Sequence, residues 1–191
     1  MYTTNSRDPR LVGMKAAVLS RLARHFPVPE FVVVSSAAYR EFQVGRTMSH
    51  KMKRELERAL ERFLKKGPVA VRSSCTAEDL PGISFAGIYT TTLNVRSVDE
   101  GIAAIKKVWA SAQSPRAQEY CHEMKIATGD MAVIIQHQLN PQVSGVVVTQ
   151  SPFSVSEVMI ECCIGLGDEL VSGAVSPMRY RIRDGKIIEQ K

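Results

Sequence analysis

A lysine, an arginine and two glycines are placed along the chain in a way that suits a phosphate-binding site. Lys15 stands in the first turn of a predicted helix, Arg72 ends a predicted strand beside Ser73, and Gly82 and Gly87 follow in a predicted loop. A phosphate site needs positive charge, inward-pointing backbone N–H groups, and glycine where the backbone must come close. Each feature alone is weak, because a helical lysine is usually solvated and a loop glycine usually serves its turn. Their combination indicates an anionic ligand.

Helices and strands of mixed order must position these residues. Hydrophobic residues at helical spacing predict helices over 11–22, 37–42 and 52–64, and Ser97 and Ser114 are expected to begin two more. Runs rich in β-branched residues predict strands over 27–35, 69–71, 88–95, 132–136, 145–149 and 158–162, and a hairpin that turns at Asp184-Gly185. Residues 76–87 lack either period and are expected to form a loop. The predicted fold class is therefore α+β, with a mostly antiparallel sheet and flanking helices.

The composition is typical of one globular domain, or of two small lobes that share a cleft. The chain has 191 residues, of which 45% are hydrophobic and 23% are charged. Its net charge of +6 favours anionic ligands, but the densest basic run, residues 51–66, alternates with glutamates as on a solvated helix face. Because no zinc-finger, basic-zipper or RNA-binding motif is present, we expect no nucleic-acid partner.

The cysteines and the hydropathy pattern bear on the cellular location. The four cysteines show no CxxC spacing and the four histidines complete no zinc pattern, so reduced thiols are expected, with Cys162 and Cys163 in the core. No apolar leader or membrane-length apolar run is present. We therefore expect a cytoplasmic protein with no membrane partner.

The stretch VAVRSSCTAEDLPGISFAGIYTTTLNV, residues 69–95, resembles the signature of the ATP-binding domain of phosphoenolpyruvate synthases (pyruvate, water dikinases). Further segments are similar to the same family in the same order: LVGMKAAVL, PVPEFVVVSSAAYREF, VIIQHQ, SGVVVT and GLGDELVSGAVSP. The resemblance spans residues 11 to about 180 and includes pyruvate phosphate dikinases and rifampin phosphotransferases. It implies an ATP-grasp-like nucleotide-binding fold, with one lobe over about residues 1–130 and an incomplete second lobe over about 131–191.

The resemblance also implies roles for particular residues. Lys15 and Arg72 would contact ATP phosphates, with Ser73 beside them, and Gly87 and Thr91 would lie in or just after the loop that covers the phosphates. The two remaining assignments concern the base and the sugar: Gln136 would sit near the adenine in the hinge between lobes, and Asp168 would take the place of the family's glutamate near the ribose.

Each of these roles has an alternative that involves no ligand. Arg72 could form a structural ion pair, and Lys15 could be a surface residue, since Met14 replaces the family's second glycine. Asp168 could simply cap a turn, and His137 is expected to be a strand side chain and not a phosphate acceptor.

The chain also departs from the family pattern. The family's magnesium-binding carboxylates and a glutamine-arginine pair come from a later segment that is absent before Lys191, and Met178 replaces an expected acid. The phosphohistidine domain and the pyruvate-binding barrel are absent as well. The resemblance thus implies ATP, and Mg²⁺ whose protein ligands lie elsewhere, in a kinase that is inactive as this chain alone.

Three functional hypotheses follow from this pattern. The chain could supply one wall of a kinase active site, with a second chain completing it, and a homodimer could cover the sheet edge that the missing segment leaves exposed. It could be a non-catalytic interaction module that keeps the fold, or a piece of a rifampin-type antibiotic phosphotransferase.

Overall fold

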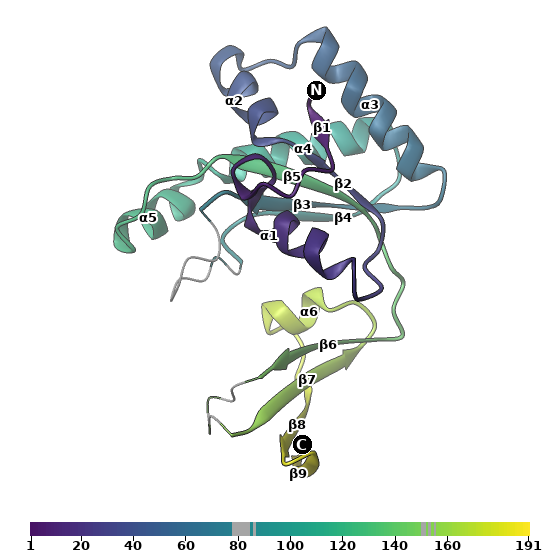
Figure 1. Ribbon diagram of the computed structural model, residues 1–191, viewed down its shortest axis with the longest axis vertical. Coiled ribbons are helices and arrows are strands. Elements are labelled where there is room, and N and C mark those ends of the chain that lie inside the picture. Colours follow the sequence, from purple (N-terminus) through teal and green to yellow (C-terminus); the bar gives the residue numbers. More distant parts are fainter. Residues whose placement is uncertain (78–84, 86, 150–151, 153, 155) are drawn as a thin grey trace. The chain divides into compact units, whose positions relative to one another are not determined.

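The computed structural model describes residues 1–77, 85, 87–149, 152, 154 and 156–191. The chain divides into two compact units, unit 1 (Met1–Gln138) and unit 2 (Leu139–Lys191) (Figure 1). Most of the loop predicted over residues 76–87, including Gly82, lies outside the described residues. None of the described helices is both long and apolar enough to cross a membrane.

Unit 1 is built on a five-stranded sheet with the strand order β1-β2-β5-β3-β4. Each neighbouring pair of strands is antiparallel. The central strands are runs of β-branched and other apolar residues, which suit a sheet that is covered on both faces. The strands are β1 (Thr3–Thr4), β2 (Phe31–Val34), β3 (Val69–Cys75), β4 (Thr91–Val95) and β5 (Met131–His137).

Five helices of the described residues accompany this sheet, and two of them begin at Ser97 and Ser114, as the sequence predicts. Ser49, Ser97 and Ser114 each accept a hydrogen bond from a backbone N–H three residues later, which satisfies a helix N-terminus. Pro115 then occupies the first helical position. The helices are α1 (Pro9–Leu22), α2 (Ser36–Gly45), α3 (His50–Leu64), α4 (Val98–Ser111) and α5 (Pro115–Glu123).

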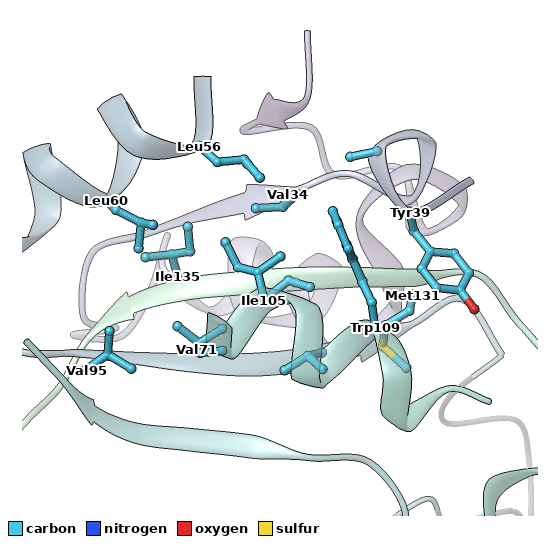
Figure 2. Close-up of a cluster of buried hydrophobic side chains, with 14 of the residues drawn as sticks. Val34, Tyr39, Leu56, Leu60, Val71, Val95, Ile105, Trp109, Met131 and Ile135 are labelled. Atoms are coloured by element: carbon cyan, nitrogen blue, oxygen red, sulfur yellow. The ribbon is translucent and has the colours of Figure 1, made fainter. Parts of the chain in front are cut away.

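The helices cover the sheet of unit 1 from both sides (Figure 1). On one face, α2, α3 and α4 bury the larger cluster, in which Trp109 is fully buried and packs near Tyr39 (Figure 2). On the other face α1 buries a smaller cluster of Val12, Ala16 and Ala17 against the sheet. Burying each large apolar side chain contributes about 1.5–3 kcal/mol, and most of these side chains belong to the larger cluster. The core therefore lies mainly on the α2–α4 face.

The described residues of unit 2 form a four-stranded antiparallel sheet with the order β6-β7-β8-β9 and one short helix. The predicted hairpin is confirmed, because Asp184 and Gly185 have φ of 50° and 71° and join two paired strands. The buried Glu157 carboxylate accepts hydrogen bonds from Arg181 and Arg183, which ties this hairpin to the rest of the sheet. The elements are β6 (Val143–Val148), β7 (Val158–Ile164), α6 (Asp168–Ser172), β8 (Met178–Arg183) and β9 (Lys186–Gln190).

The predicted α+β class with mostly antiparallel sheets is confirmed, but two local expectations need correction. The two compact units divide after Gln138, because β5 pairs with both β2 and β3 and so belongs to the first sheet. β3 continues to Cys75, so Arg72 lies within the strand and not at its end. Cys162 and Cys163 are only partly buried.

Candidate functional site

The lysine predicted to contact phosphate lies just after a kink in α1. Gly13 has φ 75° and ψ 164°, so the helical conformation is interrupted at this residue. Backbone of this kind is readily adopted only by glycine. A Cβ at Gly13 would lie 2.0 Å from the carbonyl oxygen of Ser74, so α1 and β3 approach each other too closely for any side chain. The glycine therefore brings the part of α1 that carries Lys15 directly against β3.

Lys15 reaches from α1 to β3. Its Nζ donates a hydrogen bond to the carbonyl oxygen of Ser73 at 3.1 Å, and Ser73 Oγ lies 3.4 Å from the same nitrogen. Ser73 is buried, whereas Lys15 is partly exposed. An ammonium is a compact charge with three donors, so Lys15 places positive charge where α1 meets the strand that also carries Arg72.

Arg72 is held by the amide of Gln136 on the same face of the sheet. The register of β3 and β5 pairs Ala70 with Gln136 and Arg72 with Ile134, so the two polar side chains are diagonal neighbours. Arg72 Nη1 donates to Gln136 Oε1 at 3.0 Å, and Gln136 Nε2 donates to the carbonyl oxygen of Pro29 at 3.1 Å. Because Gln136 is only 6% exposed, its amide is a fixed support that orients one edge of the guanidinium group.

Thr91 and Gly87 approach this face from β4 and the turn before it. Thr91 pairs directly with Arg72 across β3 and β4, so both side chains lie on one face, and Thr91 is exposed. Gly87 has φ 73° and lies in an exposed turn, where a Cβ would meet nothing within 4 Å. The structure thus brings Lys15, Arg72, Ser73, Thr91 and Gln136 together through β3 and its neighbours, with Gly87 four residues before Thr91.

Asp168 belongs to unit 2, where it is the first residue of α6, whereas the other predicted site residues belong to unit 1. Its side chain is exposed, and the N-cap position before it is Gly167. Glu169 follows, so the first turn of α6 carries two acids, which stabilise a helix N-terminus through its positive dipole end. The non-ligand alternative for Asp168 is therefore supported by a local role, and a ribose contact stays a prediction.

A separate cleft of about 570 Å³ lies on the α2–α4 side of unit 1. Its charged lining residues, Arg40 and Asp130, form an ion pair at 2.5 Å and neutralise each other. Burial raises the pKa of Tyr39, which also lines the cleft and therefore stays a neutral phenol. With no net charge among its lining residues, this cleft is less suited to a triphosphate than the face that carries Lys15 and Arg72.

Two long-range hydrogen-bonded contacts that support the site were not apparent from the sequence. The hydroxyl of Ser74 bonds both ends of the α1 kink, and the carbonyl of Pro29 holds the amide that supports Arg72. The sequence contained two signs of the first contact, Gly13 before the helical lysine and Ser74 after Ser73. That these two residues meet is decided only by the long-range contact of α1 with β3.

Taken as a set, the side chains on this face can bind an anion. Two cations lie on adjacent elements, one as an ammonium hydrogen-bonded to the backbone of β3 and one as a planar guanidinium held by a buried amide. Arginine in a fixed orientation suits bidentate contact with phosphate, and a lysine adds an adjustable point charge. The arrangement is therefore suited to binding an anion and stabilising its charge.

Residues 43–191 match the protein family described as pyruvate phosphate dikinase, AMP/ATP-binding domain. This chain belongs to that family. The match includes Arg72, Thr91 and Gln136 of the site, and extends through unit 2. The ATP-grasp-like nucleotide-binding fold expected from the motifs accords with this membership.

Curated relatives agree with the family assignment. The chain is 31% identical to an uncharacterized phosphotransferase, YvkC, of Bacillus subtilis over 100% of this chain and 26% of the relative. It is 33% identical to a probable phosphoenolpyruvate synthase of Archaeoglobus fulgidus over 98% and 32%, and 39% identical to a rifampicin phosphotransferase of Bacillus subtilis over 69% and 16%. The chain therefore spans about a third or less of the length of these relatives.

Among solved structures, the chain is similar to the dinucleotide-forming acetyl-coenzyme A synthetase 1 of Candidatus Korarchaeum cryptofilum. The TM-score is 0.40 and the identity is 10%, over 87% of this chain and 56% of the synthetase chain. So remote a likeness carries no functional inference.

Proposed function

We propose that this chain binds ATP and takes part in phosphoryl transfer as one portion of a kinase similar to phosphoenolpyruvate synthase. The observation that supports this most directly is the pairing of Lys15 with β3 beside Arg72, whose guanidinium is held at 3.0 Å by Gln136. The ATP phosphates would lie against these two cations. Thr91 would offer a hydroxyl from the neighbouring strand, and Gly87 would leave the backbone accessible in the turn before it.

In this proposal the protein groups bind and orient the nucleotide and stabilise negative charge. Phosphoryl transfer depends chiefly on positioning and on neutralising charge that spreads over the phosphate oxygens. Lys15 and Arg72 provide that positive charge from two different elements, so their spacing is set by the packing of α1 on β3. Gln136 would act through Arg72, and a contact with the adenine is the alternative role to be tested.

Mg²⁺ is expected from the family resemblance, but the described residues do not supply a protein site for it. No group of three or more histidine, cysteine, aspartate or glutamate side chains able to hold a metal occurs in the part of the chain that the structure describes. Magnesium prefers carboxylate and phosphate oxygens in octahedral geometry. No magnesium ligand is therefore assigned among the described residues, and titrations with and without the ion test whether magnesium changes the affinity for ATP.

Further polypeptide is proposed to complete the kinase. The exposed apolar side chains of unit 2 are one reason, because Val143, Val147 and Ile164 are 57%, 58% and 82% exposed on the sheet β6–β9. Register places these three residues and their partners on one sheet face, which would be covered in an assembled enzyme. The phosphoryl acceptor and a cytoplasmic location remain predictions.

The test is isothermal titration of the purified chain with ATP, with and without magnesium. We expect binding in the micromolar to millimolar range, and a loss of at least about tenfold in Arg72→Ala and in Lys15→Ala, because each removes a charge-assisted contact with phosphate. Circular dichroism of each variant would show that it is folded.

Arg40→Ala is the matched control, since it removes the same charge on the opposite side of the sheet, at the neutral cleft. Its affinity for ATP should equal that of the unaltered chain. Absence of ATP binding by the folded, unaltered chain would contradict the proposal and favour a non-catalytic interaction module. A loss of binding in Arg40→Ala alone would place the nucleotide in the cleft instead.

A further inference from the structure

The hydroxyl of Ser74 occupies the gap that the kink opens in α1. In a regular α-helix the N–H of Ala16 would donate to the carbonyl of Val12, four residues earlier. Here Ser74 Oγ accepts from the N–H of Ala16 at 3.0 Å and donates to the carbonyl oxygen of Val12 at 2.8 Å. A side chain from β3 thus replaces one helical hydrogen bond at Gly13, which is a recognised cause of a helix kink.

The contact is buried and tightly constrained. Ser74 is 0% exposed, as is Val12, and Gly13 has no room for a side chain against the backbone of Ser74. A buried N–H and a buried carbonyl each need a partner, and one hydroxyl satisfies both. The Ser74 hydroxyl therefore ties the helix turn that begins after the kink to β3.

That turn carries Lys15, and the strand carries Arg72. Residues two apart on a strand point to the same face, so Ser74 and Arg72 project to the same side of the sheet. The β3 register agrees, because Arg72 and Ser74 pair with Ile134 and Ala132, both on the α1 face. One strand therefore sets the place of both cations, Arg72 directly and Lys15 through the kink.

We propose that Ser74 is a positioning residue, which locks the kink of α1 onto β3 and thereby directs Lys15 to the phosphates of the nucleotide. This inference rests on the proposed function, because it assumes that the phosphates lie against Lys15 and Arg72. Ser74 itself touches no phosphate in this arrangement, since both of its hydrogen bonds are made to the backbone of α1.

The decisive experiment compares the affinities of the full chain for ATP and for adenosine in four proteins: the unaltered chain, Ser74→Ala, Lys15→Ala and the double variant. Titration calorimetry measures ATP, and ligand-observed NMR measures adenosine at millimolar concentrations. In Ser74→Ala we expect ATP to bind about tenfold more weakly, with adenosine changed by less than about twofold, because only the phosphate contact is displaced. In the Lys15→Ala background the Ser74 substitution should have no further effect on ATP.

Ser36→Ala is the matched control for loss of a buried serine bond to α1. Ser36 is also 0% exposed, and its hydroxyl donates to the carbonyl of Arg10 at 2.8 Å, on the other side of the kink from Lys15. This variant should lose stability without changing the ratio of ATP affinity to adenosine affinity. Ser74→Cys keeps nearly the same volume with weaker hydrogen bonds, so it gives an intermediate loss and replaces Ser74→Ala if that protein does not fold.

The outcomes separate this inference from the proposed function. If the unaltered chain does not bind ATP, the proposed function fails. If it binds ATP and the Ser74 variants bind equally well, or lose ATP and adenosine affinity in proportion, only the positioning role is overturned. Equal effects of Ser36→Ala and Ser74→Ala on the affinity ratio would overturn it too, as would additive losses in the double variant.

Discussion

Replacing Gly13 with alanine is the sharpest test of the contact between α1 and β3. The added Cβ would lie 2.0 Å from the carbonyl oxygen of Ser74 and 2.4 Å from its hydroxyl oxygen. The first of these atoms belongs to the backbone of a central strand and cannot move aside cheaply. We therefore expect α1 to be pushed from β3, with loss of both hydrogen bonds made by Ser74.

The magnitude has two parts. Alanine at φ 75° and ψ 164° occupies a region that is almost restricted to glycine, which costs about 1–3 kcal/mol. Losing the two buried hydrogen bonds of Ser74 adds about 2 kcal/mol, at about 1 kcal/mol each. The sum of about 3–5 kcal/mol is a large fraction of the roughly 5–15 kcal/mol that stabilises a typical domain.

Urea unfolding followed by tryptophan fluorescence suits this measurement. Trp109 is the single tryptophan of the chain, is fully buried and lies in the core of unit 1, so its signal reports the unit that contains Gly13. Extrapolation of the unfolding free energy to zero urea gives the change for each variant, provided that the slope of the transition is unchanged.

Gly87→Ala is the matched control, because Gly87 has a similar φ of 73° but open space around its Cβ position. It should show backbone strain alone. Gly45→Ala adds neither backbone strain nor a steric clash, since Gly45 has no positive φ and the nearest atom to its added Cβ would be 3.7 Å away. Its free energy of unfolding should therefore be almost unchanged. Equal losses in Gly13→Ala and Gly87→Ala would refute the close approach of α1 to Ser74.

Three further substitutions test separate contacts. Gln136→Leu removes the acceptor that holds Arg72, so the affinity for ATP measured by calorimetry should fall about tenfold while the affinity for adenosine is unchanged. An equal loss of affinity for adenosine would instead mean that the Gln136 amide contacts the adenine. Burial raises the pKa of Glu55, but hydrogen bonds donated by Thr3 and Tyr2 outweigh this and leave its pKa below the ordinary value. Its carboxylate therefore stabilises the fold at pH values above the ordinary pKa of glutamate, and this stabilisation disappears as the pH falls through the lowered pKa. The loss of unfolding free energy in Glu55→Gln should shrink over the same pH range, and urea unfolding at several pH values would show or refute this. Hydrogen bonds from two arginines of β8 hold the pKa of Glu157 below its usual range, so Glu157→Gln should weaken amide-exchange protection of β8 at neutral pH and progressively less in acid, and unchanged protection at neutral pH would contradict this.

Much of the local structure could be predicted because its causes lie within a few residues of the chain. Ser97 and Ser114 begin α4 and α5 because each hydroxyl meets an N–H three residues later. Asp184-Gly185 makes the hairpin because both residues tolerate positive φ. The hydrophobic spacing of α3 likewise predicts which face is buried, with Met52, Leu56, Leu60 and Phe63 on it.

The candidate site could be predicted only in part. Arg72 and Lys15 were identified from charge and motif, and the structure places both at β3. The predicted strand over 69–71 was too short, because Arg72 and the two serines after it are polar and interrupt the apolar pattern. The pairing of β5 with β2 and β3, which places β5 in the first sheet, could not be predicted from the local sequence.

By itself, the sequence determined the types of element, their caps and turns, and membership of the nucleotide-binding family. Only the tertiary structure decided that Ser74 closes the kink of α1 and that Gln136 supports Arg72. These contacts join residues 58 to 64 positions apart. Their formation depends on strand register and on the absence of a side chain at Gly13, which are settled when the chain packs and not by any short run of residues.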